Sequence, residues 1–268
     1  MKELVDAVPD DLRILICLGF TLLLVMLRLD AQRFNAAEYD EPVKGFQPSL
    51  LRRLAWYTLG VGGVLLLVVL HPSAEFSLHL TVGDRAGILL AVVLAVIGVG
   101  QAIALAWLHY HRLRLPDIAA YPGALANEVI TAFIDEAVFR GALLGYLLWA
   151  MSGAVAKGGI TEGDAQYLAI LGSTVAYVLA TRLGAPGRDR YMFAVAAVTG
   201  LVGGWATVLT GGIGASFLGH ASTRVAIFLT TGHAGQPPAR GTEIEDVERR
   251  RRTPEGWRAV DRGGAREH

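Results

Sequence analysis

Seven long apolar segments constrain this chain more than any other feature of its sequence. A helix needs about 20 mostly apolar residues to cross roughly 30 Å of hydrocarbon, and a spanning chain must satisfy its backbone hydrogen bonds internally. The sequence therefore predicts an all-α, polytopic transmembrane helical bundle with about seven spans. These spans cover residues 12–29, 51–70, 86–108, 125–151, 165–181, 191–209 and 213–231.

Composition agrees with a surface that faces lipid. Charged residues make up 18% of the chain and hydrophobic residues 53%, whereas a soluble domain is about a quarter charged. The 24 basic and 24 acidic residues cancel, so the net charge gives no reason to expect a nucleic-acid partner. Cys17 is the only cysteine, which excludes an internal disulfide. The lipid bilayer is the first predicted partner.

Basic residues alternate between the two ends of the predicted spans. Arg28, Arg52, Arg112 and Arg188 lie at the first, third and fifth connections, and the alternate connections hold few basic side chains. Positive charge is retained on the cytoplasmic side of a membrane. The pattern predicts a multi-pass protein with its N-terminus outside and its C-terminus in the cytoplasm. Arginine is common and lysine rare, a usage typical of GC-rich bacterial genes. The predicted location is therefore a bacterial plasma (inner) membrane.

The chain divides into a membrane part and a polar tail. Residues 1–232 are predicted as the transmembrane helical domain, and residues 233–268 as a charged cytoplasmic tail. In the tail, Thr242 and Glu245 form a capping box for a short helix. The helical surface and the 242–268 segment could contact other membrane protein subunits, and the tail could also contact anionic lipid.

Ionisable residues lie in the middle of two predicted spans. Asp135 and Glu136 are about ten residues inside the fourth span, roughly 15 Å from its start, and Arg140 follows one turn later. The seventh span carries His220 and Arg224 at a similar depth. A charge at mid-bilayer costs about 2.5–3.5 kcal/mol even on the gentlest scale. We expect these five side chains to converge into one polar cluster.

Several interpretations of that cluster are open. A buried ion-pair network could join Asp135 and Glu136 to Arg140 and Arg224 and lock the helices without chemistry. A zinc site could use His220 with the two carboxylates, and a transporter would also suit charges inside the membrane. A retinal receptor is excluded because no lysine lies in a predicted span. We predict no cofactor and no metal.

The residues around the cluster form recognisable motifs. The run Phe133-Ile-Asp-Glu-Ala-Val-Phe-Arg-Gly141 contains both carboxylates, and a glycine-rich segment from Gly200 leads to His220. These motifs resemble those of the CPBP family of intramembrane proteases, which contains the CAAX-processing and Abi-type proteins. The resemblance covers about residues 118–229 and implies a CPBP-like core there. It also implies that the motif residues form a catalytic site.

Three motif positions depart from the family. Asp135 stands in place of the first glutamate, and Arg224 stands where the family has Asn or Asp. If residues 177–181 occupy the second motif, Thr181 stands at the position of the lost histidine, which in the family acts with the first glutamate to activate water. Water activation needs a base of suitable geometry and pKa. The resemblance therefore implies a degenerate, non-catalytic protease site.

Two alternatives to that function remain. The chain could be a structural or assembly subunit of a larger membrane complex. It could also be an active intramembrane endopeptidase with altered site chemistry, whose catalytic residues would be the cluster at Asp135, Glu136, Arg140, His220 and Arg224.

Overall fold

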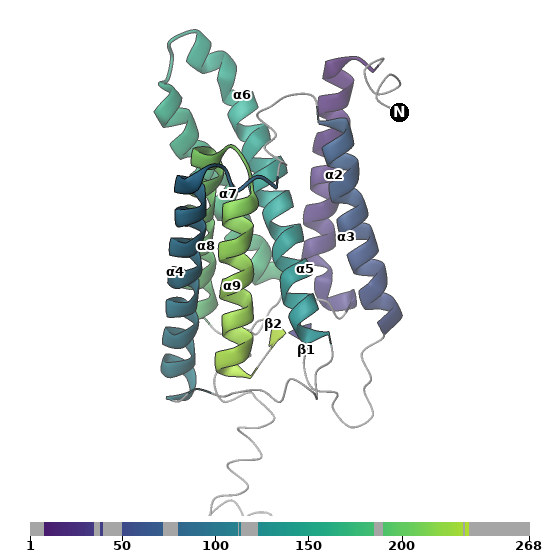
Figure 1. Ribbon diagram of the computed structural model, residues 1–268. Coiled ribbons are helices and arrows are strands. Elements are labelled where there is room, and N and C mark those ends of the chain that lie inside the picture. Colours follow the sequence, from purple (N-terminus) through teal and green to yellow (C-terminus); the bar gives the residue numbers. More distant parts are fainter. Residues whose placement is uncertain are drawn as a thin grey trace, which may run out of the picture.

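The computed structural model describes residues 8–34, 38–39, 50–71, 80–111, 113, 123–184, 190–232 and 234–235. Within these ranges nearly all of the chain is helical, and the helices stand side by side in one bundle (Figure 1). The predicted all-α fold is confirmed. A short antiparallel pair, β1 (Glu38–Tyr39) with β2 (Ala234–Gly235), is the one departure from it in the described part of the chain. The predicted capping box at Thr242 lies outside the described residues.

The first three apolar segments form α2 (Asp10–Leu29), α3 (Leu50–Leu70) and α4 (Arg85–Tyr110). Helix α4 begins where Asp84 caps it: its carboxylate accepts hydrogen bonds from the backbone N–H groups of Ala86 and Gly87 at 2.9 and 3.1 Å. Such a cap satisfies N–H groups that have no partner within the helix. The helix then runs for 26 residues, long enough to cross a bilayer.

The fourth apolar segment is one continuous helical run that changes its winding. It starts as α5 (Ala124–Glu136), widens into the π-helical segment η3 (Ala137–Leu143) and continues as α6 (Leu144–Ala156). π-Helical turns inside α-helices are rare and are frequent at functional sites. This one begins directly after the two predicted carboxylates and contains Arg140.

The last three helices are α7 (Glu162–Gly184), α8 (Tyr191–Thr210) and α9 (Gly214–Thr231). Helices α8 and α9 are joined by a tight turn in which Gly211 has a φ of +67°. Helix α9 packs closely on α4. The two helices leave no room for a Cβ at Gly98, which would collide with Thr223. Small residues at such contacts let helix backbones approach each other in a membrane.

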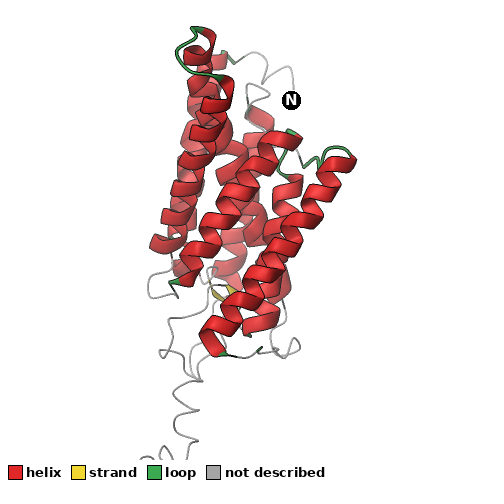
Figure 2. Ribbon diagram, turned by 90° about the vertical axis from the view of Figure 1, so that its left-hand side faces the viewer, coloured by secondary structure: helices red, strands yellow, loops and turns green. Residues whose placement is uncertain are grey.

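The outer surface of the bundle is apolar. Leu89, Val96 and Leu209 are 65%, 67% and 70% exposed. Five helical segments, namely α2, α3, α4, the α5 to α6 run and α8, are long and apolar enough to cross a membrane. Among the described residues α7 and α9 do not meet that criterion, and both pack against the other helices. Figure 2 shows the bundle of helices from a second side. A helical membrane bundle is therefore confirmed, with its two most polar segments packed among the five.

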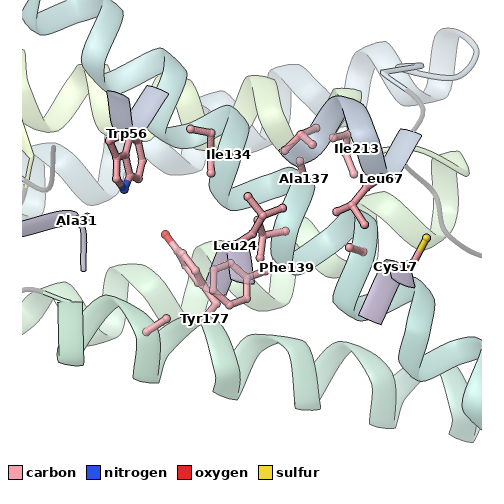
Figure 3. Close-up of a cluster of buried hydrophobic side chains, with 14 of the residues drawn as sticks. Cys17, Leu24, Ala31, Trp56, Leu67, Ile134, Ala137, Phe139, Tyr177 and Ile213 are labelled. Atoms are coloured by element: carbon pink, nitrogen blue, oxygen red, sulfur yellow. The ribbon is translucent and has the colours of Figure 1, made fainter. Parts of the chain in front are cut away.

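A hydrophobic core joins the N-terminal hairpin to the centre of the bundle. Trp56 of α3, Ile134 of α5 and Phe139 of η3 are buried in one cluster (Figure 3). The indole N–H of Trp56 donates to the backbone oxygen of Leu27 at 3.0 Å. This bond holds the end of α2 against α3, and the next residue, Arg28, is buried inside the bundle.

Candidate functional site

The five residues predicted to converge lie on neighbouring elements in the interior. Asp135 and Glu136 end α5, Arg140 lies in η3, and His220 and Arg224 lie on α9. The two carboxylates and Arg140 are fully buried, and His220 is 3% exposed. Because α5 packs against α9, the structure brings the five side chains into one region, although they divide between three separate pairings.

Glu136 is the centre of the first pairing. Its Oε1 lies 2.8 Å from Nδ1 of His220 and 3.5 Å from Nη1 of Arg140. The hydroxyl of Tyr177 lies 3.1 Å from the other ring nitrogen of His220, and the Arg140 guanidinium stacks 4.1 Å above the Tyr177 ring. Both nitrogens of the imidazole are therefore engaged, and its orientation is fixed from two sides.

Asp135 forms the second pairing with a residue that sequence analysis missed. Its Oδ1 accepts a hydrogen bond from Nε of Arg28 at 2.6 Å, and the two side chains are 0% and 2% exposed. In the sequence, Arg28 serves only as one of the basic residues that indicate the membrane orientation. Its position inside the first apolar run, one residue before the end of α2, is the signal that could have assigned it to the interior.

Arg224 forms the third pairing, with a carboxylate that the ion-pair alternative did not include. Its Nη2 lies 2.9 Å from Oε2 of Glu128, on α5, and not beside Asp135 or Glu136. Oε1 of Glu128 accepts a hydrogen bond from the Asn127 amide at 3.1 Å, and the Tyr57 hydroxyl donates to Asn127 in turn. His220 and Arg224 lie one helical turn apart on α9 and are therefore level with different parts of α5. For this reason His220 contacts Glu136 and Arg224 contacts Glu128.

Thr181, at the predicted position of the lost histidine, is 6% exposed on α7. It follows Tyr177 by one helical turn, and Tyr177 is the α7 residue that contacts His220. A threonine hydroxyl is a donor and an acceptor but not a base at neutral pH.

Several polar atoms in the middle of the cluster have no hydrogen-bond partner among the described residues. In the described part of the chain, Oδ2 of Asp135 and the three guanidinium nitrogens of Arg140 have no hydrogen-bond partner. Among these same residues no group of three or more His, Cys, Asp and Glu side chains is placed to hold a metal ion. In chemical terms the cluster offers one hydrogen-bonded carboxylate and imidazole pair and two carboxylates occupied by arginines.

Comparison with protein families bears on the same segment. The family model described as "Type II CAAX prenyl endopeptidase Rce1-like" matches residues 117–226, which run from α5 through most of α9 and contain Asp135, Glu136 and Arg224. This confirms the resemblance to the CPBP family. No curated protein and no solved structure matches the chain. Arg28 and Tyr57 lie outside the matched segment.

Proposed function

We propose that this Rce1-like membrane protein of the CPBP family is non-catalytic, and that its buried charges lock the helices together. The observation that carries the proposal is the 2.6 Å contact between Arg28 and Asp135. A general base must be within reach of the proton that it abstracts. Oδ1 of Asp135 is directed at the Arg28 guanidinium and not at a water molecule, and Oδ2 is buried without a hydrogen-bond partner among the described residues.

The surroundings of Asp135 support the same conclusion. Thr181 supplies no imidazole at the position where the family resemblance implies one. His220, the imidazole that is present, is held by Glu136 at 2.8 Å and by Tyr177 at 3.1 Å. In this structure the ring nitrogen of His220 that does not face Glu136 faces the Tyr177 hydroxyl. The degenerate-site interpretation therefore rests on three residues and not on one replacement.

The pairings link helices that are far apart in the sequence. Arg28 joins α2 to α5, and Arg224 and His220 each join α9 to α5. Buried pairs with defined geometry can fix which helices meet. A bundle held in this way suits a structural or assembly subunit, whose partners would be other membrane proteins bound through the helical surface and the 242–268 tail.

A cleavage assay tests the proposal. The purified chain in liposomes is incubated with prenylated CAAX peptides, and the released tripeptide is measured for the wild type, Asp135→Asn and Thr181→His. We expect no release above protein-free liposomes for the wild type and Asp135→Asn, because Asp135 is held by Arg28 and residue 181 is a threonine and not a histidine. The exposed Asp164→Asn serves as the matched control. Cleavage by the wild type that Asp135→Asn abolishes without changing the melting temperature would refute the proposal.

One observation favours an active endopeptidase as the second candidate. Glu136 and His220 form a buried carboxylate and imidazole hydrogen bond of 2.8 Å, an arrangement that enzymes use to orient a proton-transferring histidine. In that case Glu136→Gln should abolish cleavage, while Asp135→Asn should weaken it less.

The proposed orientation places the N-terminus outside and the tail in the cytoplasm of a bacterial plasma membrane. It rests on the alternation of basic residues between connections. Asp6→Cys and Thr253→Cys variants are treated with a membrane-impermeant thiol reagent on intact cells. Only the first should be labelled, and the wild type controls for Cys17, which is buried. Labelling of the second would refute the orientation.

A further inference from the structure

A small polar cavity lies beside the ion-pair cluster, between α4, α8 and α9. Its volume is about 20 Å³. Gln101 enters it from α4 and belongs to none of the three pairings described above. The other polar side chains that line it are Thr199 of α8 and Ser216, His220 and Thr223 of α9.

Three polar atoms on two side chains at this cavity are not satisfied by the protein. Both Oε1 and Nε2 of Gln101, and Oγ1 of Thr199, are inaccessible to solvent and have no hydrogen-bond partner among the described residues. Buried polar groups in native proteins are nearly always hydrogen-bonded, and an unpaired one is destabilising. Three such atoms around one cavity therefore point to a ligand that completes their bonds.

We propose that the cavity binds one water molecule, which bridges Gln101 and Thr199. A cavity needs about 10–15 Å³ to hold one water, and the water needs two to four polar partners. The volume of about 20 Å³ is enough for one such molecule. Water also both donates and accepts, as the two ends of a glutamine amide require. A metal cation would leave the Gln101 N–H groups unpaired in either orientation of the amide.

Gly203 places this water next to the ion-pair cluster. It lines the cavity, and a Cβ built on it would lie 3.7 Å from both Nε of Arg140 and Oε2 of Glu136. Neither atom has a hydrogen-bond partner among the described residues. The bound water thus extends the polar network to α4, which lies outside the family-matched segment. This inference holds whether or not the protein cleaves peptides.

The first test is an experimental structure of the full chain in which other internal waters are visible. We expect a density peak within about 3.2 Å of the Gln101 amide and the Thr199 hydroxyl. A continuous map that shows other buried waters and no peak at this position would overturn the proposal.

The second test is the sign of a stability change. If the water is present, Gln101→Leu removes its main partner, and the melting temperature should fall by about 2–4 °C, the change expected for one hydrogen bond in a chain of this size. Thr199→Val should shift it in the same direction by less. If the cavity is dry, Leu removes an unpaired amide and the melting temperature rises, which would overturn the proposal. Gln166→Leu, on the surface part of α7, is the matched control and should change little.

Discussion

The centre of the bundle and its rim use the same kind of ion pair in different surroundings. At the centre, Arg28 and Asp135 meet at 2.6 Å with side-chain exposures of 2% and 0%. At the rim, Arg13 and Asp10 meet at 3.2 Å with exposures of 14% and 75%. An exposed pair contributes about 0–1 kcal/mol, because water solvates each charge well without its partner. A buried charge that loses its partner has no such alternative.

The comparison shows which polar contacts the fold depends on. The central pairs join helices from different parts of the chain, whereas the pair between Asp10 and Arg13 is local, within one turn of α2. Substitutions at the centre should therefore affect assembly of the whole bundle, and removal of the exposed Asp10 carboxylate at the rim only the start of α2.

The largest effect is expected for Arg28→Leu. It leaves Asp135 buried without its guanidinium, which should lower the free energy of unfolding by about 3–5 kcal/mol. Unfolding in detergent, followed by the accessibility of Cys17, measures the change, because Cys17 is fully buried in the folded state. Asp10→Asn at the rim is the control, because the Asp10 side chain is 75% exposed, and it should cost about 0–1 kcal/mol. Equal effects of the two substitutions would contradict the distinction between centre and rim.

A smaller effect is expected for Arg224→Leu. Glu128 loses the ion pair at 2.9 Å but keeps the hydrogen bond from Asn127, so the expected cost is about 1.5–3 kcal/mol. Glu128→Gln in the same background should recover part of the loss, since it removes the unpaired charge. The same unfolding measurement applies, and a double variant less stable than Arg224→Leu alone would show that Glu128 is not the partner.

Tyr177→Phe removes one hydroxyl and little else. His220 loses its contact at Nε2 but keeps Glu136 at Nδ1, so the expected cost is that of one neutral hydrogen bond, about 0.5–1.5 kcal/mol. Imidazole proton resonances would report the change at His220 directly. An unchanged His220 signal would mean that the hydroxyl does not bond the ring.

The smallest effect lies at the exposed start of α7. Hydrogen bonds from the side chain and backbone N–H of Thr161 lower the pKa of Asp164. Because the folded-state pKa is below the unfolded one, this contribution to stability is present above the unfolded pKa and is lost as the pH falls through the folded pKa. Asp164→Asn should therefore melt slightly below the wild type at pH 7, and the gap should close in acid. A gap that is constant with pH would exclude this origin.

The helix boundaries could be predicted closely because lipid imposes them. The segment predicted over residues 51–70 is α3 (Leu50–Leu70), and that over residues 191–209 is α8 (Tyr191–Thr210). Apolar length fixes where a helix enters and leaves the hydrocarbon. The gathering of Asp135, Glu136 and His220 followed from the cost of a lone charge at the same depth.

The pairing of charges could not be predicted in the same way. Depth along a span gives no information about the rotation of one helix against another. Arg28 therefore reads as a charge at a span end, and the ion-pair alternative joined Arg224 to Asp135 and Glu136 and did not include Glu128. The π-helical segment at Ala137–Leu143 changes that rotation again, and it leaves no signature in hydropathy. The catalytic roles of these residues remain predictions.

The pairing of Arg28 with Asp135 is tested most directly by a double-mutant cycle. The free energies of unfolding are measured for the wild type, Arg28→Met, Asp135→Leu and the double variant. Each single variant should lose about 3–5 kcal/mol, and the double variant should recover most of it, because replacing both members of a buried ion pair by apolar residues is often neutral or stabilising. Additive losses would mean that the two side chains do not hold each other, and would leave Asp135 free to act as a base.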